Sequence, residues 1–103
     1  MIITEEVKQV VQGTAFLSLV TSNPDGSPHL IIAGKGEVSG ETVVFGIYKM
    51  EQTQANLLKN KNACVAGAVQ KAGENPKGFR LTGTAEAQGK QLIFTPSKAE
   101  ALL

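Results

Sequence analysis

Residues 14–35 read TAFLSLVTSNPDGSPHLIIAGK, and this stretch decides the fold. The run 14–21 is apolar and β-branched, as strands are, and a second such run extends from Ser27 to about Lys35. Between them stands Asn23-Pro24-Asp25-Gly26, in which the proline presets φ and the glycine tolerates a positive φ. A short turn of this kind joins strands that run in opposite directions, so the stretch predicts an antiparallel hairpin.

The strand-like pattern continues toward the C-terminus. Further apolar runs bounded by turn residues occupy residues 42–47, 62–70, 79–87 and 91–95. The segment 36–41 suits a strand end and a tight turn, and the polar segment 71–78 suits a loop. We expect Pro96–Leu103 to cap the end of the fold or to dock on a partner. The sequence therefore predicts six short strands.

Two segments have helical patterns. Residues 5–12 follow Thr4, a suitable N-cap, and space Val7, Val10 and Val11 along one stripe that can be buried. Residues 51–60, EQTQANLLKN, contain neither glycine nor proline and repeat apolar side chains at helical spacing. Six strands and two short helices predict a mainly β fold, a small barrel with helices over its mouth.

The composition limits the classes of function. The 103 residues suffice for one domain, residues 1–103, with a single core. Ten basic and nine acidic residues give a net charge of +1, too little to attract nucleic acid or an anionic membrane surface. Charged residues make up only 18% of the chain, which is a low share to cover the surface of a monomer. We therefore expect part of the surface to belong to an interface.

The chain has one cysteine, Cys64, and one histidine, His29. A disulfide framework, a zinc site of several thiolates and a histidine-rich metal site are thereby excluded. We interpret Cys64 as a small buried residue of a strand, and His29 as a structural residue at a strand entry. The sequence has no signal-peptide pattern and no apolar run of membrane-spanning length, so a reduced, cytoplasmic setting is expected.

Residues 45–53, FGIYKMEQT, run from a predicted strand directly into a predicted helix. A helix start leaves backbone N–H groups unpaired, and these bind phosphate with the helix dipole in their favour. Thr53 adds a hydroxyl, Gln52 an amide and Lys49 a positive charge, whereas Glu51 adds a negative one. The alternative is an ordinary helix start on a solvated edge, with Thr53 as a local cap, and spacing alone leaves both interpretations open.

Arg80 is the sole arginine, and strand residues flank it on both sides. Such an arginine is more often a surface or interface ion-pair partner than a ligand clamp. Its planar fork nevertheless suits a phosphate or an interchain carboxylate, so Arg80 stays among the candidate ligands. The sequence predicts neither a catalytic side chain nor a metal ligand.

Four motifs in a fixed order carry a family resemblance: TSNPDGSPHL (21–30), TVVFG (42–46), QTQANL (52–57) and GFRLTGTA (78–85). The chain resembles the pyridoxamine 5'-phosphate oxidase-like family of FMN-binding split barrels over about residues 14–95, and in particular its small single-domain FMN-binding proteins. The resemblance implies a six-stranded antiparallel Greek-key split β-barrel with two or three short helices. It also implies a homodimer that holds FMN in clefts at the subunit interface.

The resemblance assigns cofactor-binding residues to this chain. The phosphate site falls on Gln52, Thr53 and Asn56. The two walls of the ring site fall on Ile32, Ala33, Gly34 and Lys35 and on Ile47, Tyr48 and Lys49, and Arg80 is added as a candidate on its side-chain geometry alone. Many family members carry lysine or arginine where this chain has Gln52, so one cationic contact is missing, and Lys49 or Lys35 is the candidate to replace it.

Flavin carries the electrons itself, so this class of protein needs no catalytic triad and no metal. We expect a cytoplasmic, homodimeric FMN-binding flavoprotein that acts as a flavin-dependent oxidoreductase or electron-transfer protein with an unidentified redox partner. The chain is far shorter than the oxidase that names the family, so a complete pyridoxamine phosphate oxidase is not expected. Two alternatives stay open: the same fold binding F420 or haem, and a cofactor-free dimeric interaction domain. Nucleic acid and membrane are not expected partners.

Overall fold

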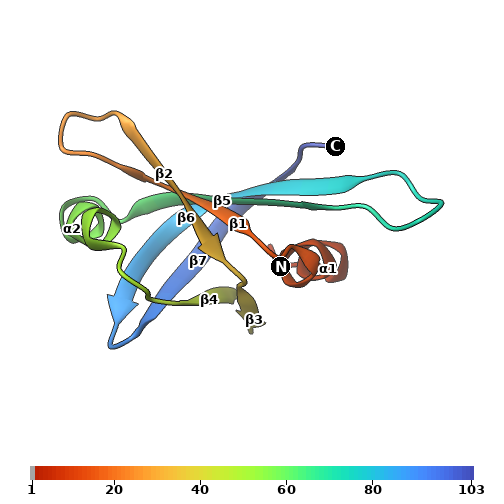
Figure 1. The fold of residues 1–103 in the computed structure, drawn as a ribbon, viewed down its shortest axis with the longest axis horizontal. Helices are drawn as coiled ribbons and strands as arrows, with labels where there is room; N and C mark the ends of the chain where they lie inside the picture. Colours follow the sequence, from red (N-terminus) through yellow and green to blue (C-terminus); the bar gives the residue numbers. More distant parts are fainter. Residues whose placement is uncertain (1) are drawn as a thin grey trace.

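The computed structural model describes residues 2–103, and Figure 1 shows their arrangement. In chain order the elements are α1 (Glu5–Gly13), β1 (Leu17–Ser22), β2 (Pro28–Gly34), β3 (Glu37–Ser39), β4 (Thr42–Gly46), α2 (Glu51–Lys59), β5 (Asn62–Val69), β6 (Lys77–Gln88) and β7 (Gln91–Ala101). The chain is mainly β, as the sequence predicts, and both predicted helices are found. Neither helix in this described range has the length and apolar character that a membrane crossing requires.

All the strands form one antiparallel sheet in the order β2-β1-β5-β6-β7-β4-β3. The predicted hairpin is confirmed as β1 and β2, which pair Val20 with Leu30 and Thr21 with His29. β2 and β3 are the two edges of the sheet, and within residues 2–103 they do not pair with each other. The sheet is therefore curved but not closed.

The prediction of six strands is wrong, because the sheet has seven. The additional strand is β3, in the segment interpreted as a strand end and a tight turn. Gly40 adopts a positive φ of 59°, which lets the chain reverse between Ser39 and Thr42 within two residues. The residues before the turn are then placed to pair with β4, so even this short segment becomes a strand.

The prediction that the last strand ends at Thr95 and that residues 96–103 cap the fold is wrong, because β7 continues through Pro96 to Ala101. Docking of this segment on a partner stays a prediction. Proline lacks the N–H group that a ladder requires, so it is tolerated in a strand only at an edge or an irregularity. The register between β6 and β7 shifts between Thr82 and Gly83, and Gly83 is the residue opposite Pro96. A Cβ at Gly83 would lie 2.1 Å from the carbonyl oxygen of Thr95, so only glycine allows this approach.

The core lies inside the curve of the sheet. Leu17 and Leu19 of β1 share one buried cluster with Val43 and Phe45 of β4, although β1 and β4 are well separated in the strand order. Gly36 joins the two edges of the sheet at this point, and a Cβ there would lie 2.9 Å from the side chains of both Leu17 and Val43. The sheet thus wraps around its core as an incompletely closed barrel.

The two helices cover different ends of this barrel (Figure 1). Thr4 caps α1 as predicted, because its Oγ1 accepts a hydrogen bond of 3.2 Å from the N–H of Val7. The valine stripe of α1 is buried against the sheet, where the helix contacts β5, β3 and β6. α2 instead contacts β1 and β6, and it buries Thr53, Asn56 and Leu57. Two of those three buried side chains are polar, so α2 is a candidate for the functional site.

Candidate functional site

The chain enters α2 through two residues in the left-handed region of backbone conformation. Lys49 has a φ of 64° and Met50 a φ of 54°, although neither is glycine. Residues with side chains rarely adopt this conformation, and such strain is concentrated at functional sites. Met50 is the N-cap, and within the described part of the chain no side chain caps the helix. The first turn of α2 therefore presents uncapped N–H groups, the arrangement that attracts an anion.

Thr53 lies in this first turn and is fully buried, with 0% of its surface exposed. Its Oγ1 has no hydrogen-bond partner anywhere in residues 2–103. The interpretation of Thr53 as a local cap is therefore wrong, because its hydroxyl caps nothing. A buried hydroxyl without a partner costs about 1–3 kcal/mol. This cost sits beside the uncapped helix start, where a ligand could offset it.

Asn56 ties α2 to the rest of the fold. It is 2% exposed, and its Nδ2 donates to Thr21 Oγ1 and to Asn23 Oδ1, each at 3.1 Å. Its Oδ1 accepts a hydrogen bond of 2.8 Å from Gln52 Nε2. The Gln52 amide is therefore directed along the helix toward its C-terminus, and its second N–H stays available to a ligand. Gln52 and Asn56 thus contact each other one turn apart on α2.

An open groove of about 540 Å³ runs between the start of α2 and the β1–β2 turn. Its lining residues are Asn23, Pro24, Asp25, His29 and Gln52. The side-chain hydroxyl and then the backbone N–H of Ser27 donate to the Asp25 carboxylate, and these bonds lower the pKa of Asp25. The carboxylate is thus held in its charged form by the turn itself.

Sequence reasoning did not connect His29 with this groove. His29 was interpreted as a structural residue, yet the register of the hairpin pairs it with Thr21, to which Asn56 of α2 donates. The signal in the sequence is the short turn, which fixes the hairpin register and so brings His29 to the same end of the sheet as α2. The sole imidazole of the chain therefore shares a groove with Gln52.

The first predicted wall of the ring site is the end of β2. Ile32 is exposed, Ala33 is half-buried against the core, Gly34 has a φ of 83° and Lys35 is exposed beyond the strand. Consecutive strand side chains point to opposite faces, so Ile32 and Ala33 cannot line the same surface with their side chains. What these residues share is the backbone of an edge strand, whose outer N–H and C=O groups face no neighbouring strand.

The second predicted wall lies between β4 and α2. Ile47 is half-buried against the core, and its N–H donates to the Lys90 carbonyl at 2.8 Å. Tyr48 is 79% exposed, and Lys49 Nζ lies 5.7 Å from the centroid of its ring. The Lys49 ammonium is thus held near an exposed aromatic ring immediately before the helix start.

Arg80 lies apart from these residues within one chain. Its Nη2 and Nε contact Glu100 Oε1 at 3.0 and 3.3 Å, and Lys98 contacts the other carboxylate oxygen at 3.6 Å. Hydrogen bonding from Arg80 is the main cause of the lowered pKa of Glu100. The structure therefore shows Arg80 as the ion-pair partner that its sequence context favours. None of its hydrogen bonds in the described chain reaches α2.

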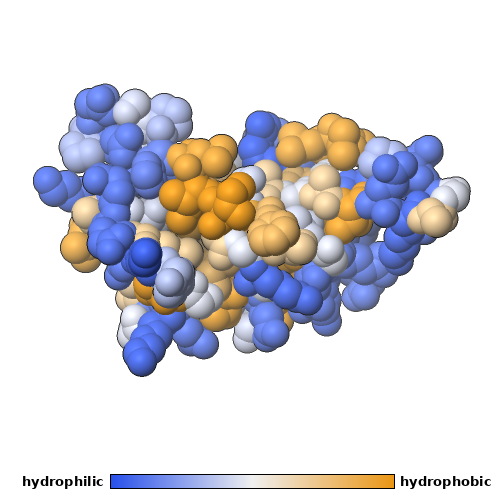
Figure 2. Space-filling view, in the orientation of Figure 1, coloured by the Kyte–Doolittle hydropathy of each residue, from blue (hydrophilic) through white to orange (hydrophobic). Residues whose placement is uncertain are grey.

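The outer face of the sheet carries an apolar surface. Register places Leu30, Val20, Cys64 and Thr82 in one cross-strand row, and Ile32, Ser18, Ala66 and Arg80 in the next. Leu30 and Ile32 are 60% and 58% exposed, and Figure 2 shows apolar surface over β2 in the middle of the molecule. We call these two rows the outer face. A surface of small and apolar side chains is typical of an interface.

Cys64 belongs to this outer face, so the prediction of a buried cysteine is wrong. The residue is half-buried, and its Sγ lies 3.7 Å from Thr82 Oγ1. Its neighbours Ala63 and Val65 take the buried positions on the other side of β5. Because strand side chains alternate, Cys64 must then face outward.

The curved open sheet, with an uncapped helix that begins shortly after β4, defines the class of small antiparallel split barrels. The sequence profile of the pyridoxamine 5'-phosphate oxidase family matches residues 3–97, and the chain belongs to this family. No curated protein matches the sequence.

Solved structures agree with this assignment of the fold. An FMN-binding protein from Syntrophomonas wolfei is similar with a TM-score of 0.78 and 14% identity, over 96% of this chain and 85% of that one. HupZ of Group A Streptococcus is similar with a TM-score of 0.80 and 19% identity, over 98% and 94%. A heme-binding protein from Mycobacterium smegmatis is similar with a TM-score of 0.72 and 15% identity, over 94% and 56%.

Proposed function

We propose that the chain is an FMN-binding flavoprotein, a homodimer that acts as a flavin-dependent oxidoreductase or electron-transfer protein. The observation that carries this proposal is the start of α2, where an uncapped first turn surrounds a buried hydroxyl without a partner. Membership of the family and the similarity to an FMN-binding protein from Syntrophomonas wolfei support the choice of ligand. The free thiol of Cys64 suits the reduced, cytoplasmic setting that we expect.

The residues at the start of α2 fit a phosphate group. The backbone N–H groups of Gln52 and Thr53 would donate to its oxygens, and a rotation of the fully buried Thr53 side chain would bring its hydroxyl to the partner that it lacks. The free N–H of the Gln52 amide and the ammonium of Lys49 would complete the shell. Glu51, in the same turn, opposes this binding by its charge, so the neutral donors must contribute most.

The ring of the flavin would lie along the edge of β2 and near Tyr48. The unpaired backbone groups at residues 32–35 would bind its polar edge, and Ile47 with the Tyr48 ring would exclude water from its face. The flavin itself supplies the electron transfer when bound. The protein would orient and shield the ring, which agrees with the lack of a predicted catalytic side chain.

A second copy of the chain is the partner that the outer face would take. Most of the two rows is apolar or small, and their single charged member, Arg80, is already paired with Glu100. Burial of such a face costs little desolvation and removes exposed leucine and isoleucine side chains from water. Ile32 lies on this face and beside the proposed ring site, so dimerisation would also close one side of that site.

The test is a titration of the purified, ligand-free protein with FMN and with riboflavin, followed by visible absorption and flavin fluorescence. We expect saturable binding of FMN, and binding of riboflavin weaker by roughly tenfold or more, because riboflavin lacks the phosphate. No binding of either flavin would overturn the proposal. Equal affinity for the two flavins would show that the protein does not bind the phosphate group of FMN.

Haem is the second candidate, because His29 lies in the groove beside Gln52 and imidazole is a common axial ligand of haem iron. Because Gln52 stands where many family members carry a cation, F420 is a third candidate ligand for the same fold. Parallel titrations with haem and F420 separate these candidates from FMN. A protein that binds none of them and remains a dimer would be the cofactor-free interaction domain.

A further inference from the structure

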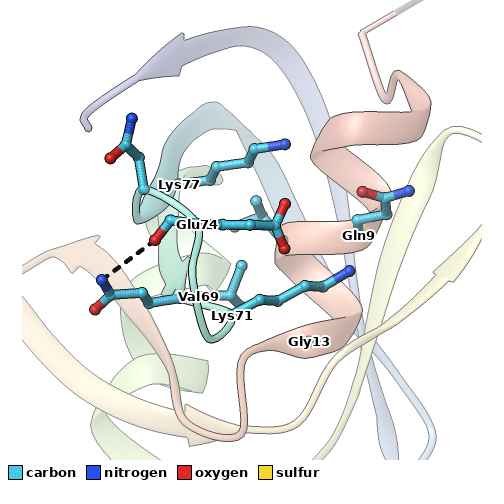
Figure 3. Close-up of a pocket in the computed structure, with 9 residues that line it drawn as sticks. Gln9, Gly13, Val69, Lys71, Glu74 and Lys77 are labelled. Atoms are coloured by element: carbon cyan, nitrogen blue, oxygen red, sulfur yellow. Dashed lines mark hydrogen bonds between the residues drawn. The ribbon is translucent and has the colours of Figure 1, made fainter.

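A separate cavity of about 440 Å³ lies between α1 and the loop that joins β5 to β6 (Figure 3). It is at the end of the molecule opposite α2 (Figure 1), and it shares no lining residue with the groove beside Gln52. Its size falls in the range of cavities that hold small organic molecules. The proposed flavin site makes no use of it.

The floor of the cavity is apolar. It is formed by Val10 and Gly13 of α1 and by Val69 at the end of β5. A Cβ at Gly13 would lie only 3.0 Å from Val69 Cγ1, so the glycine lets the helix end and the strand approach closely. This floor suits an apolar side chain rather than a polar group.

The rim of the cavity is charged. Figure 3 shows the side chains of Lys71 and Glu74 extending toward α1 from the loop, and that of Lys77 from the start of β6. Within residues 2–103 none of the three takes part in an ion pair. Two ammonium groups and one carboxylate therefore surround the opening without neutralising one another by direct contact.

The loop that carries this rim has a defined turn. The N–H of Glu74 donates to the Lys71 carbonyl at 3.0 Å, and Gln70 Nε2 donates to the Glu74 carbonyl at 3.4 Å. Gly73 adopts a φ of 78°, which permits the chain to reverse there. The turn sets Lys71 and Glu74 on one side of the cavity opening, across from α1.

The cavity stays open in the dimer proposed above. Side chains of β5 alternate between the two faces, so Val69 lies on the side of α1, whereas Ala66 and Ala68 lie on the other side. Ala66 belongs to the outer face that a second copy would cover. A ligand in the cavity and a partner on the outer face can therefore be bound at the same time.

We propose that this cavity binds a free α-amino acid with an apolar side chain. The carboxylate of the ligand would contact Lys71 and Lys77, its ammonium group would contact Glu74, and its side chain would cover the Val10–Gly13–Val69 floor. One ligand would thereby satisfy both signs of charge and the apolar surface. The inference does not depend on flavin binding.

The test is calorimetry and ¹H–¹⁵N NMR of the full chain with four probes. L-phenylalanine carries all three recognised groups, L-phenylalaninamide lacks the carboxylate, N-acetyl-L-phenylalanine lacks the ammonium group and glycine lacks the side chain. We expect saturable binding of phenylalanine, with shifts at residues 9–13 and 69–77, and roughly tenfold or greater weakening for each other probe. No saturable binding of phenylalanine, or equal binding of its amide, would overturn the proposal.

Variants locate the site independently. The double variant Lys71→Ala/Lys77→Ala and the single variant Glu74→Gln should each weaken phenylalanine binding by roughly tenfold or more. Lys90→Ala, which removes an exposed lysine from the β6–β7 turn, is the matched control and should bind as the wild type does. Unchanged binding in folded rim variants would show that phenylalanine binds elsewhere and would contradict the assignment.

Discussion

At the scale of single residues, Thr53 is the most informative position in the molecule. Its hydroxyl is fully buried, has no partner in the described chain and stands in the first turn of an uncapped helix. A fold that held this helix start only for structural reasons would gain stability from an apolar residue of the same shape. The proposed phosphate site accounts for the threonine, because a bound phosphate would supply the missing partner.

Thr53→Val should change stability and affinity in opposite directions. Valine keeps the branched shape and removes the unpaired hydroxyl, so the ligand-free protein should become more stable by about 1 kcal/mol in urea unfolding. FMN affinity should fall roughly tenfold, while riboflavin affinity should stay unchanged. Thr84→Val, at an exposed position of β6, is the matched control and should alter neither quantity. Loss of stability in Thr53→Val would mean that the hydroxyl has a partner in the free protein.

Gln52→Lys should also change FMN affinity and the stability of the ligand-free protein in opposite directions. A lysine at this position places a cation beside the proposed phosphate, so FMN should bind roughly three- to tenfold more tightly at low salt, and less so at high salt. The same cation opposes the helix dipole, so the ligand-free protein should lose about 0.3–1 kcal/mol. Ala55→Lys adds the same charge farther along the helix and should leave FMN affinity unchanged. If Gln52→Lys binds FMN no better than wild type, the phosphate does not lie at this helix start.

At the residue scale the sequence predicted the start of α2 and its hydrogen-bond donors, but neither the burial nor the hydrogen-bond partners of those donors. Whether Thr53 is buried and whether the Gln52 amide turns to Asn56 depend on packing against β1, which lies about thirty residues away in the chain. Cys64 was misplaced because β5 carries small or apolar residues on both faces. Without a polar face, the alternation of a strand does not show which side is buried.

At the scale of elements, the irregular pairing of β6 with β7 is the feature that sequence patterns could not supply. Pro96 suggested an end to the last strand, and by itself proline does end a ladder. The strand continues because Gly83, twelve residues before Thr95, has no Cβ and so lets the Thr95 carbonyl oxygen approach closely. β3 was missed for a different reason. A strand of three residues is too short to show the alternation of apolar and polar side chains.

Gly83→Ala should therefore disrupt the β6–β7 pair. A Cβ that would lie 2.1 Å from a backbone oxygen forces the strands apart, because backbone cannot move aside as a flexible side chain does. We expect a loss of about 3 kcal/mol or more in urea unfolding, with lost amide protection in residues 95–101. Gly46→Ala is the control, since its Cβ would meet nothing within 4 Å and its φ is not positive. Equal stability of the two variants would contradict this account of β7.

At the scale of the whole molecule, the described chain has three surfaces that no other part of it covers. The outer face exposes Leu30 and Ile32, and the opposite ends of the barrel carry the α2 groove and the α1 cavity. The low share of charged residues had indicated an interface, and the register of four strands shows which side chains form an apolar face. Composition predicts an interface, but only the strand order shows which apolar face is exposed to form one.

Ile32→Lys should convert the proposed dimer into a folded monomer. An ammonium group in the middle of an apolar interface would be buried without a counter-ion, which is strongly unfavourable, whereas on a free surface it costs little. Sedimentation of the wild type should give twice the chain mass, and that of the variant the chain mass, with unchanged circular dichroism. Leu58→Lys, at an exposed position of α2 outside the outer face, should remain dimeric. A wild type that sediments as a monomer would rule out this interface.

The central claim is that the start of α2 binds the phosphate of FMN, and a crystal structure of the protein with FMN tests it most directly. The account predicts phosphate oxygens within about 2.7–3.2 Å of the backbone nitrogens of Gln52 and Thr53, with the Thr53 hydroxyl directed at one of them. A phosphate bound elsewhere, or a Thr53 hydroxyl still without a partner in the FMN complex, would contradict it.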